Sequence, residues 1–384
     1  METQIARVFK PGNQGYFLFG PRGTGKTTFL KQKYPDAIYY NLLDYELFRQ
    51  FSSKPERLAD VLREVKERTV IIDEIQKIPQ LLQVIHMIIE EKRGICFILT
   101  GSSARKLKKS GADLLAARVL KYSFHPFMAC ELGERFNLDE ALEFGLLPVI
   151  YSSPEKATAI KTYASMYVKE EVLDEGLVRN IGNFSRFLEI VSFSHGSILN
   201  VSNVARDCQV ERKTVEGYIA ILEDLLIAYR VPVFTKKAKR ILIKHPKFYL
   251  FDIGLFNGLR PLGPIDNPGS IGGSALEGLV FQHLTAWNSY RGDNNKISYF
   301  ITKSGLEVDF VIYGKETFYA VEVKNTSNVK DSDLRALKAF SQDYPEAKPV
   351  FLYRGKYRLK KSNITCIPVE EFLKGLDPSK AGII

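Results

Sequence analysis

The chain has 384 residues, of which 45% are hydrophobic and 26% charged, and it contains neither a low-complexity run nor a recognisable repeat. This length and composition exclude a single small module and widespread disorder, and no apolar stretch approaches the roughly 20 residues of a membrane span. The formal net charge of +10 suits a polyanionic partner, although a basic surface also serves solubility.

The N-terminus and the cysteines indicate the compartment. The N-terminal sequence METQIARVFKPGNQG lacks the apolar core of a signal peptide. The cysteines, Cys96, Cys130, Cys208 and Cys366, are scattered without a pairing pattern. We therefore expect a cytoplasmic protein that contacts no membrane.

The first half of the chain alternates short β-branched or aromatic runs with helical segments. The runs are YFLF (16–19), AIYYNL (37–42), TVIID (69–73) and ICFILT (95–100). This alternation predicts an α/β domain with a parallel sheet.

A glycine-rich loop follows the first of these runs. GPRGTGKT at 20–27 fits the pattern G-x-x-x-x-G-K-[ST] and precedes the helical stretch TTFLKQKY. Glycines let backbone N–H groups approach phosphates closely, and the helix N-terminus aims further donors at the same anion. The loop predicts a P-loop NTPase in which Lys26 reaches the β and γ phosphates of ATP and Thr27 holds Mg²⁺. The expected ATP-binding residues are Gly20, Pro21, Arg22, Gly23, Thr24, Gly25, Lys26, Thr27 and Thr28.

A second acidic motif ends the third run, in TVIIDEIQK (69–77). Asp73 at the end of a buried strand can hold Mg²⁺ through water, and Glu74 is then placed to polarise the attacking water. An ordinary strand end can also carry two acidic residues, but the glycine-rich loop upstream favours the catalytic interpretation.

Two further roles have competing candidates. The fourth run leads into GSSARK, where Thr100, Ser102 or Ser103 could sense the γ-phosphate, although Ser102 or Ser103 could equally cap a helix. Arg105 and Arg118 are candidates for an arginine finger that stabilises transition-state charge, and we take Arg118 as the catalytic candidate. Most arginines in such a segment only solvate a helix.

From Pro154 to about Leu226, strand signals largely stop and apolar residues recur at helical spacing. Within this region a short helix from about Ser202, a turn near Gln209 and a longer helix predict a helix-turn-helix. The longer helix is expected to carry Val215, Ile219, Leu222 and Leu226 on its apolar face. Two β-like runs follow, IAYRVPVF and KFYLFDIGL, so we expect a winged helix.

The predicted wing is basic. Residues 200–260 contain eleven Lys and Arg against six Asp and Glu, a net charge of +5, which is half that of the chain. Such clustering favours contact with DNA phosphates. Winged helices also serve as packing or protein-docking modules, and Glu211 and Glu216 on the second helix would repel DNA. The wing residues are Lys236, Lys237, Lys239, Arg240, Lys244 and Lys247.

A loop rich in Gly and Pro, RPLGPIDNPGSIGGS (260–274), is the best candidate for a domain boundary. We therefore expect three domains: an AAA-type ATPase domain at 1–153, a helical region with a winged helix at 154–260, and an α/β domain at 261–384.

The last domain carries a set of carboxylates. Glu277 lies in the helical stretch GGSALEGLVFQHLTAW, and two strands follow, ISYFITKSGLEVDFVIYG and FYAVEVKN. Since strand side chains alternate, Glu307 and Asp309 share one face, as do Glu322 and Lys324. Asp309 and Glu322 can hold Mg²⁺ while Lys324 orients or deprotonates water beside a scissile phosphate. A surface strand that alternates Glu and Lys would show the same pattern.

Taken together, these motifs resemble the prokaryotic ATP-binding proteins that pair an AAA-type ATPase with the C-terminal domain called DUF4143. The matching segments are GPRGTGKTT, VIIDEIQK, ILTGSS, LLAAR, KFYLFDIGL, KSGLEVDF and VEVK. The resemblance implies a winged helix followed by a restriction-endonuclease-like domain similar to PD-(D/E)xK nucleases. It points to Lys26, Thr27, Asp73 and Glu74 for ATP, and to Glu277, Asp309, Glu322 and Lys324 for the nuclease-like site. Ala117 departs from the family, which usually has glycine before the arginine, and Val308 departs from the PD-(D/E)xK motif, whose name expects proline before the aspartate.

The sequence thus predicts an ATP hydrolase that couples nucleotide state to a DNA-binding, Mg²⁺-dependent nuclease-like module. The alternative is an ATP-switched DNA-binding or assembly regulator in which the nuclease fold is inert. DNA is the expected partner, and the sequence leaves a homo-oligomer open.

Overall fold

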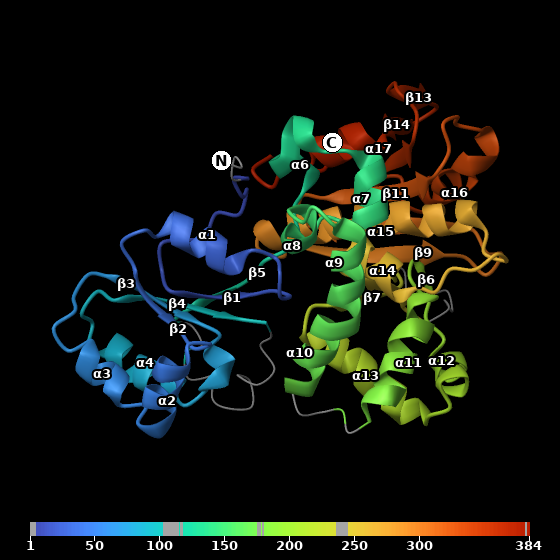
Figure 1. Ribbon diagram of the computed structural model, residues 1–384. Coiled ribbons are helices and arrows are strands. Elements are labelled where there is room, and N and C mark those ends of the chain that lie inside the picture. Colours follow the sequence, from blue (N-terminus) through green and yellow to red (C-terminus); the bar gives the residue numbers. More distant parts are fainter. Residues whose placement is uncertain are drawn as a thin grey trace. The chain divides into compact units, whose positions relative to one another are not determined.

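The computed structural model describes residues 5–102, 115, 118–174, 178, 180–235, 245–380 and 382–384. The described residues form two compact units, each of which can be followed in Figure 1. The first unit comprises residues 9–125 and 224–226, and the second comprises residues 1–8, 126–223 and 227–384. The predicted boundaries after residues 153 and 260 both lie within the second unit, and the three-domain division stays a prediction.

The first unit is built on a parallel sheet of five strands in the order β2-β3-β4-β1-β5. This confirms the predicted parallel α/β sheet, and all four predicted runs form strands. The fifth strand escaped the sequence pattern because it is short and partly exposed. The strands are β1 (Tyr16–Phe19), β2 (Ile38–Asn41), β3 (Thr69–Asp73), β4 (Cys96–Gly101) and β5 (Leu120–Ser123).

Helices pack beside this sheet and bury its central strands. Val70, Ile72 and Leu99 are completely buried, as expected for a parallel sheet whose central strands read as continuous apolar runs. Asp44 caps α2 by accepting a hydrogen bond from the Leu47 N–H. The helices of the unit are α1 (Lys26–Lys33), α2 (Tyr45–Ser53), α3 (Arg57–Val61) and α4 (Leu81–Glu90), with a 3₁₀ turn at Ile75–Lys77.

The second unit begins with a helical region. The predicted helical spacing around Ile160 is confirmed, with one π-helical turn at Tyr163–Tyr167 between α9 and α10. The helices before the helix-turn-helix are α6 (Ala129–Leu132), α7 (Leu138–Phe144), α8 (Pro148–Tyr151), α9 (Lys156–Thr162), α10 (Val168–Asp174) and α11 (Ile181–Ser192).

The predicted helix-turn-helix is formed by α12 (Val201–Cys208) and α13 (Arg212–Asp224). Gln209 adopts a left-handed conformation with φ of 58°, and the Val210 N–H returns to the Ala205 carbonyl, which closes the turn. Leu226 was expected on the second helix but lies beyond its end, because the helix stops at Asp224.

Two antiparallel strands follow this motif, β7 (Ala228–Val231) and β8 (Lys247–Leu250), and a two-residue strand, β6 (Ser197–Ile198), pairs with β8. The prediction that the second run continues as a strand through DIGL is wrong. Asp252 instead caps α14 (Ile253–Leu259) by accepting hydrogen bonds from the Gly254 and Leu255 N–H groups.

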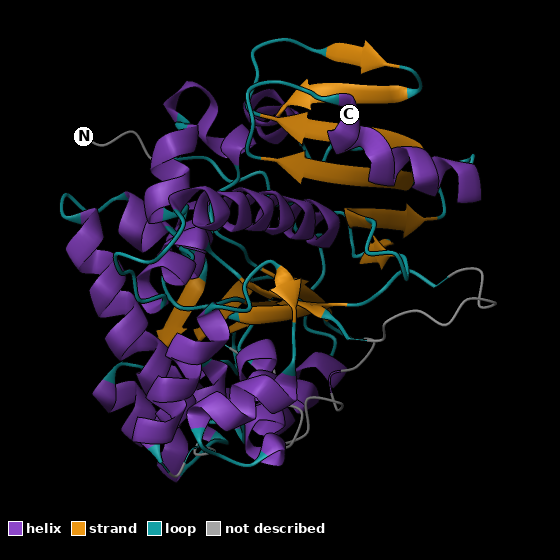
Figure 2. Cartoon of the chain, turned by 90° about the vertical axis from the view of Figure 1, so that its right-hand side faces the viewer, coloured by secondary structure: helices purple, strands orange, loops and turns teal. Residues whose placement is uncertain are grey.

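The C-terminal part of the second unit holds a mixed six-stranded sheet in the order β13-β14-β12-β11-β10-β9, whose strands lie side by side in Figure 2. The run ISYF to VIYG was expected to be one strand, but residues 302–306 turn and divide it into β9 and β10. The elements are β9 (Asn295–Ile301), β10 (Glu307–Gly314), β11 (Phe318–Lys324), α16 (Arg335–Asp343), β12 (Lys348–Tyr353), β13 (Leu359–Lys361), β14 (Ile364–Pro368) and α17 (Val369–Gly375).

A helix of 23 residues, α15 (Pro268–Tyr290), replaces the second half of the loop predicted at 260–274. The helix begins where Asn267 accepts a hydrogen bond from the Gly269 N–H, with Pro268 at its first position, although the glycines that follow suggested a loop. Further along, Gly278 permits close packing, because a Cβ there would overlap the ring of His195. His195 accepts a hydrogen bond from the Leu250 N–H, and burial lowers its pKa to about 3, so the ring is neutral at pH 7. Within the described residues no helix, α15 included, has the length and apolarity that a bilayer crossing needs.

A short N-terminal segment belongs to the second unit. Arg7 is buried and forms an ion pair of 3.0 Å with Glu131, and it also donates to the Pro126 carbonyl and to the Tyr290 hydroxyl, each at 3.3 Å. The Val8 N–H donates to the same Glu131 carboxylate at 2.8 Å. Residues 9–125 are therefore flanked on both sides in the chain by segments of the second unit.

Candidate functional site

The glycine-rich loop lies between β1 and α1 and has the backbone that phosphate binding requires. Gly23 and Gly25 have φ values of 84° and 87°, in the left-handed region that favours glycine. The Lys26 ammonium donates to the carbonyl oxygens of Gly20 and Pro21, at 2.7 and 3.2 Å. The loop therefore holds its lysine over its own backbone at the N-terminus of α1, where an anion would be bound.

The side chains predicted to hold Mg²⁺ are in contact. The Thr27 hydroxyl at the start of α1 donates to Asp73 at the end of β3, with 2.7 Å between the oxygens. The Tyr39 hydroxyl donates to the same carboxylate oxygen, and the Thr100 hydroxyl donates to the other one. Asp73 is buried, so these three hydroxyls replace the water that its charge would otherwise require. A hydroxyl beside a carboxylate is an oxygen donor set that suits Mg²⁺.

Glu74 has an unusual backbone conformation, with φ of 62° and ψ of 44°. This left-handed geometry is costly for a residue with a Cβ, and such strain concentrates at functional sites. The Glu74 N–H donates to the Thr100 hydroxyl at 3.2 Å, and its carboxylate accepts a hydrogen bond from the Gln76 amide. The same amide lies 3.3 Å from the Ser102 hydroxyl. Gln76 therefore fixes the orientation of the predicted catalytic carboxylate.

The candidates for the γ-phosphate sensor and for the arginine finger make different contacts. Thr100 contacts Asp73 and the backbone of Glu74, whereas Ser102 contacts Gln76. Arg118 forms an ion pair of 2.5 Å with Glu90 at the end of α4, which lowers the pKa of that glutamate. Its role as an arginine finger stays a prediction.

Some predicted residues lie outside the described part of the chain. These are Ser103, Arg105, Ala117 and the wing residues Lys236, Lys237, Lys239, Arg240 and Lys244.

The carboxylates predicted in the last domain do come together, from α15, β10 and β11. Strands β10 and β11 pair from Phe310 and Val321 onward, so Asp309 and Glu322 are the next positions on each strand. Asp309 accepts a hydrogen bond of 2.9 Å from the Val323 N–H. Glu322 is 3% exposed and forms an ion pair of 2.6 Å with Lys324. Its Oε2 atom is buried and has no hydrogen-bond partner in the part of the chain that the structure describes.

Lys247 is not a wing residue, contrary to the prediction, but the centre of this carboxylate cluster. It starts β8 and is only 1% exposed. Its ammonium lies 2.8 Å from Glu277 Oε1 and 3.3 Å from Asp309 Oδ1, and it also pairs with Glu307. The Tyr249 hydroxyl, two residues along the same strand, donates to Glu277 Oε1 at 2.5 Å. Strand alternation brings Lys247 and Tyr249 to the same face.

The electrostatics of the cluster follow from its burial. Burial raises the pKa of Glu277 to about 7, and Asp309 adds to the rise while Lys247 opposes it. Burial, and then Asp309, raise the pKa of Glu322 well above its usual range. Burial works against the charge of Lys247, but the surrounding phenol and carboxylates raise its pKa well above the usual value. Lys247 is therefore charged at pH 7.

These residues do not fit a divalent metal in the arrangement observed. The Lys247 ammonium donates to Glu277 Oε1 and Asp309 Oδ1, the oxygens that a metal in its place would contact. The other Asp309 oxygen, Oδ2, accepts a hydrogen bond from the Val323 N–H of β11. Among the residues that the structure describes, no group of three or more His, Cys, Asp or Glu could hold a metal ion.

Comparison with known proteins finds domain families that match the segments containing the two sites. The AAA domain family matches residues 12–133, which contain the glycine-rich loop, Asp73 and Glu74. An AAA domain is found here. Two domains of unknown function match the remainder, DUF8612 at residues 135–266 and DUF4143 at residues 272–372. Lys247 thus lies in the DUF8612 match, whereas the carboxylates that surround it lie in the DUF4143 match.

One solved structure resembles the chain only weakly. It is the Signal Transduction ATPase with Numerous Domains (STAND) protein with a tetratricopeptide repeat sensor from Pyrococcus horikoshii, with 14% identity and a TM-score of 0.22. The match covers 72% of this chain but only 45% of that chain. No curated protein matches.

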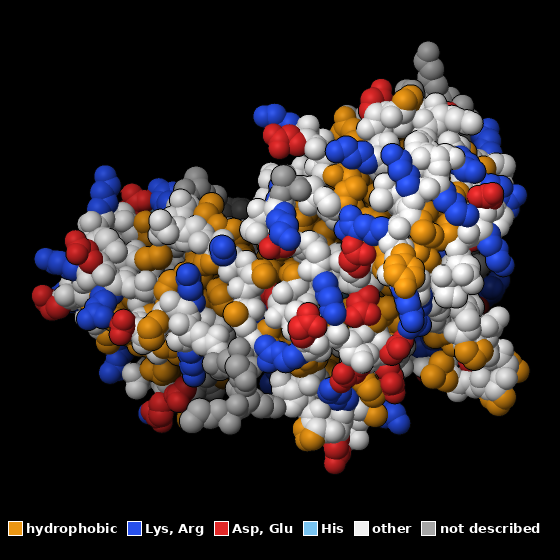
Figure 3. Space-filling model, turned by 90° about the horizontal axis from the view of Figure 1, so that it is seen from above, with side chains coloured by type: hydrophobic (Ala, Val, Ile, Leu, Met, Phe, Trp, Pro, Cys, Tyr) orange, Lys and Arg blue, Asp and Glu red, His pale blue; other side chains and the backbone are white. Residues whose placement is uncertain are grey.

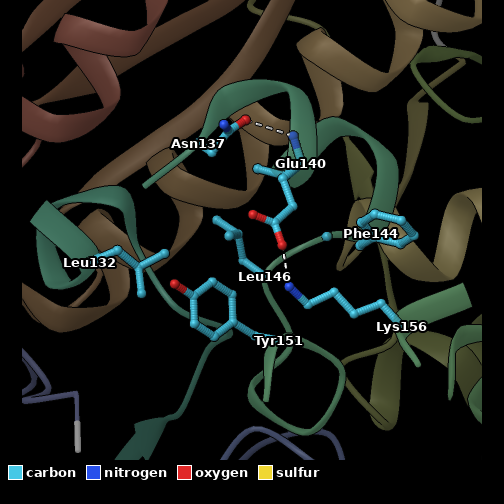
Figure 4. Close-up of a pocket in the computed structure, with 9 residues that line it drawn as sticks. Leu132, Asn137, Glu140, Phe144, Leu146, Tyr151 and Lys156 are labelled. Atoms are coloured by element: carbon cyan, nitrogen blue, oxygen red, sulfur yellow. Dashed lines mark hydrogen bonds and ion pairs between the residues drawn. The ribbon is translucent and has the colours of Figure 1, made fainter. Parts of the chain in front are cut away.

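Two cavities of the second unit are lined by none of the carboxylates and lysines of the carboxylate cluster. Figure 4 shows one beneath α7, where Lys156 reaches Glu140 and the Glu140 N–H donates to Asn137. Its volume of about 10 Å³ holds no more than one water molecule. A more open cavity of about 290 Å³ lies between the loop before α7 and the end of β12, where Arg354 pairs with Asp139.

Sequence reasoning missed several residues of the two sites. Gln76 stands two positions after Glu74 in the DEIQK motif, and Tyr39 lies in a run that was interpreted only as a strand. Lys247 and Tyr249 alternate at the start of KFYLF, and a lysine in such an apolar run was the available signal of a buried charge. The partner of that charge could not be found without the fold.

Proposed function

We propose that the AAA domain binds ATP together with Mg²⁺ and hydrolyses it. The observation that supports this proposal most is the contact of 2.7 Å between the Thr27 hydroxyl and Asp73, beside a loop that carries Lys26. Residues 46 positions apart are brought together at the ends of β1 and β3, where parallel sheets bind their ligands. The match to the AAA domain family supports the same conclusion.

The roles of the residues follow from their positions. The backbone N–H groups of residues 22–27, at the end of the loop and the start of α1, would bind the phosphates. The Lys26 ammonium would leave the carbonyls of Gly20 and Pro21 and contact the phosphates instead. Mg²⁺, held through Thr27 and Asp73, would neutralise charge on the phosphate oxygens. Glu74, oriented by Gln76, would accept the proton of the attacking water. Thr100 would hold Asp73 and Glu74 in fixed positions relative to each other, because it is hydrogen-bonded to both.

The direct test is to incubate the purified full chain with ATP and to measure both binding and phosphate release, with and without Mg²⁺. We expect ATP to bind and phosphate release to require Mg²⁺. The assay should include a duplex-DNA arm, since turnover can depend on a partner. If ATP neither binds nor is hydrolysed in any arm, the proposal is wrong.

For the second unit we propose a DNA-contacting module, and the α12–α13 helix-turn-helix is the observation that favours it. Glu216, whose charge would oppose DNA, pairs with Arg212 at 3.0 Å, so its repulsion is partly offset. Figure 3 shows Lys and Arg side chains interspersed with acidic and uncharged ones on the face in view.

DNA binding measured against salt concentration tests this module, because each phosphate contact adds about 0.9 to the negative log–log slope. A flat slope would favour a protein-docking role. Of the two nuclease-like alternatives, the lysine inside the carboxylate cluster favours the inert fold. We expect no Mg²⁺-dependent cleavage of single-stranded, duplex or branched DNA, and cleavage that Asp309→Asn abolishes would reverse this assignment.

A further inference from the structure

The carboxylate cluster of the second unit already contains a cation. We propose that the ammonium of Lys247 is the resident cation of the Glu277, Glu307 and Asp309 cluster, and that removing its charge converts the cluster into a binding site for one divalent cation. This inference rests on the proposed inert state of the nuclease-like domain but is independent of ATP hydrolysis.

The contacts of Lys247 define it as the centre of the cluster. Its side chain is 2% exposed, and it contacts carboxylates from α15 and from two positions of β10. The ring of Tyr299 lies 5.7 Å from the ammonium and covers a further side. A lysine this deeply buried cannot place its charge in solvent. Its ion pairs are therefore what stabilises that charge in the interior.

The negative charges of the carboxylates could not remain without the Lys247 ammonium. The Glu277 side chain is 15% exposed, Asp309 is buried, and the nearby Asp309 carboxylate adds to the raised pKa of Glu277. With a neutral residue at position 247, their repulsion and desolvation would be unopposed. A small cation with a preference for oxygen ligands would then be bound, because it offers these carboxylates the charge that the lysine supplied.

The cluster also has an entry path and an unused acceptor. Glu307 is 32% exposed at its side chain, so one edge of the cluster reaches solvent and hydrated ions. On β11, the strand beside Asp309, Glu322 Oε2 is buried and has no hydrogen-bond partner among the residues that the structure describes. Together with Glu277 and Asp309 it would complete a set of carboxylate oxygens contributed by one helix and two strands.

The other lysine of the region is a matched control. Lys324 pairs with Glu322 at 2.6 Å, but its side chain is 45% exposed and it lies at the end of β11. Neutralising it would remove an equal charge without opening the space between Glu277 and Asp309. The two lysines thus separate an effect of position from an effect of net charge.

The experiment uses the full chain without nucleotide and titrates it with Mn²⁺, with binding measured by electron paramagnetic resonance and unfolding by differential scanning calorimetry. The variants are Lys247→Met, Lys324→Met, Asp309→Asn, and Lys247→Met combined with Asp309→Asn. Lys247→Met should bind one Mn²⁺ with a dissociation constant of about 10⁻⁴–10⁻³ M and unfold several degrees higher with the metal. The wild type, Lys324→Met and the double variant should show no such site.

Three metal-binding results and one folding result would overturn the proposal. One is a folded Lys247→Met protein that binds no Mn²⁺, and a second is an equal site in Lys324→Met. The third is a wild-type site that Asp309→Asn removes. If Lys247→Met folds only when Mn²⁺ is present during its production, the proposal is supported. If the metal does not restore folding while the double variant folds, the proposal is wrong. DNA cleavage by the wild type would refute the inert assignment separately.

Discussion

Glu74→Gln should lower the rate of ATP hydrolysis at saturating ATP by about 10²–10⁴-fold, the usual contribution of a positioned general base. Glutamine keeps the size of the side chain and its place beside Gln76 but cannot accept a proton from water. The strained backbone conformation of Glu74 orients this side chain. We therefore expect the substitution to lower the rate of hydrolysis and not the affinity for ATP. Steady-state phosphate release gives the rate.

Nucleotide affinity is the control for this variant, because Glu74 follows the predicted Mg²⁺ ligand and does not belong to the phosphate loop. Calorimetric titration with ATP should give an affinity within a few fold of the wild type. Hydrolysis at the wild-type rate would show that another residue activates the water.

Lys26→Ala should weaken ATP binding by about 10- to 100-fold, the effect of losing one charge-assisted hydrogen bond of roughly 1.5–3 kcal/mol to the phosphates. Lys26 is 7% exposed at the first position of α1, so its ammonium has little freedom to act elsewhere. The measurement is calorimetric titration of the variant with ATP and Mg²⁺.

Lys33→Ala is the matched control, since Lys33 is exposed at the last turn of the same helix. It removes an equal charge from α1 and should leave affinity unchanged. If the two variants bind ATP equally, the effect belongs to the net charge of the helix and Lys26 has no special role. The variants at positions 26 and 74 should thus differ in kind, one in binding and the other in turnover.

The site in the AAA domain was largely predictable because its information is local. A glycine-rich loop between a strand and a helix, and an acidic pair at a strand end, are each contained in fewer than ten residues. The contact of Thr27 with Asp73 then follows from the parallel sheet, whose strands end at one edge. Gln76 and Tyr39 add to this site through side-chain packing, which has no sequence pattern of its own.

The second unit was harder to predict, because its key contacts join distant segments. Lys247 and Asp309 are 62 positions apart, and the spacing of charged residues carries no sign that they meet. The first turns of α15 were mispredicted for another reason. The glycines at 269, 272 and 273 favour a loop, and they obscured the local start signal of the Asn267 cap followed by Pro268.

The ion pair between Arg7 and Glu131 constrains the order in which the chain can be completed during synthesis. Residues 5–8 are synthesised before their partners, Pro126, Glu131 and Tyr290, all of which follow residues 9–125 in the chain. This segment can therefore form its native contacts only after residues 9–125 have been made. The contacts of residues 5–8 are thus among the late steps in the folding of the second unit.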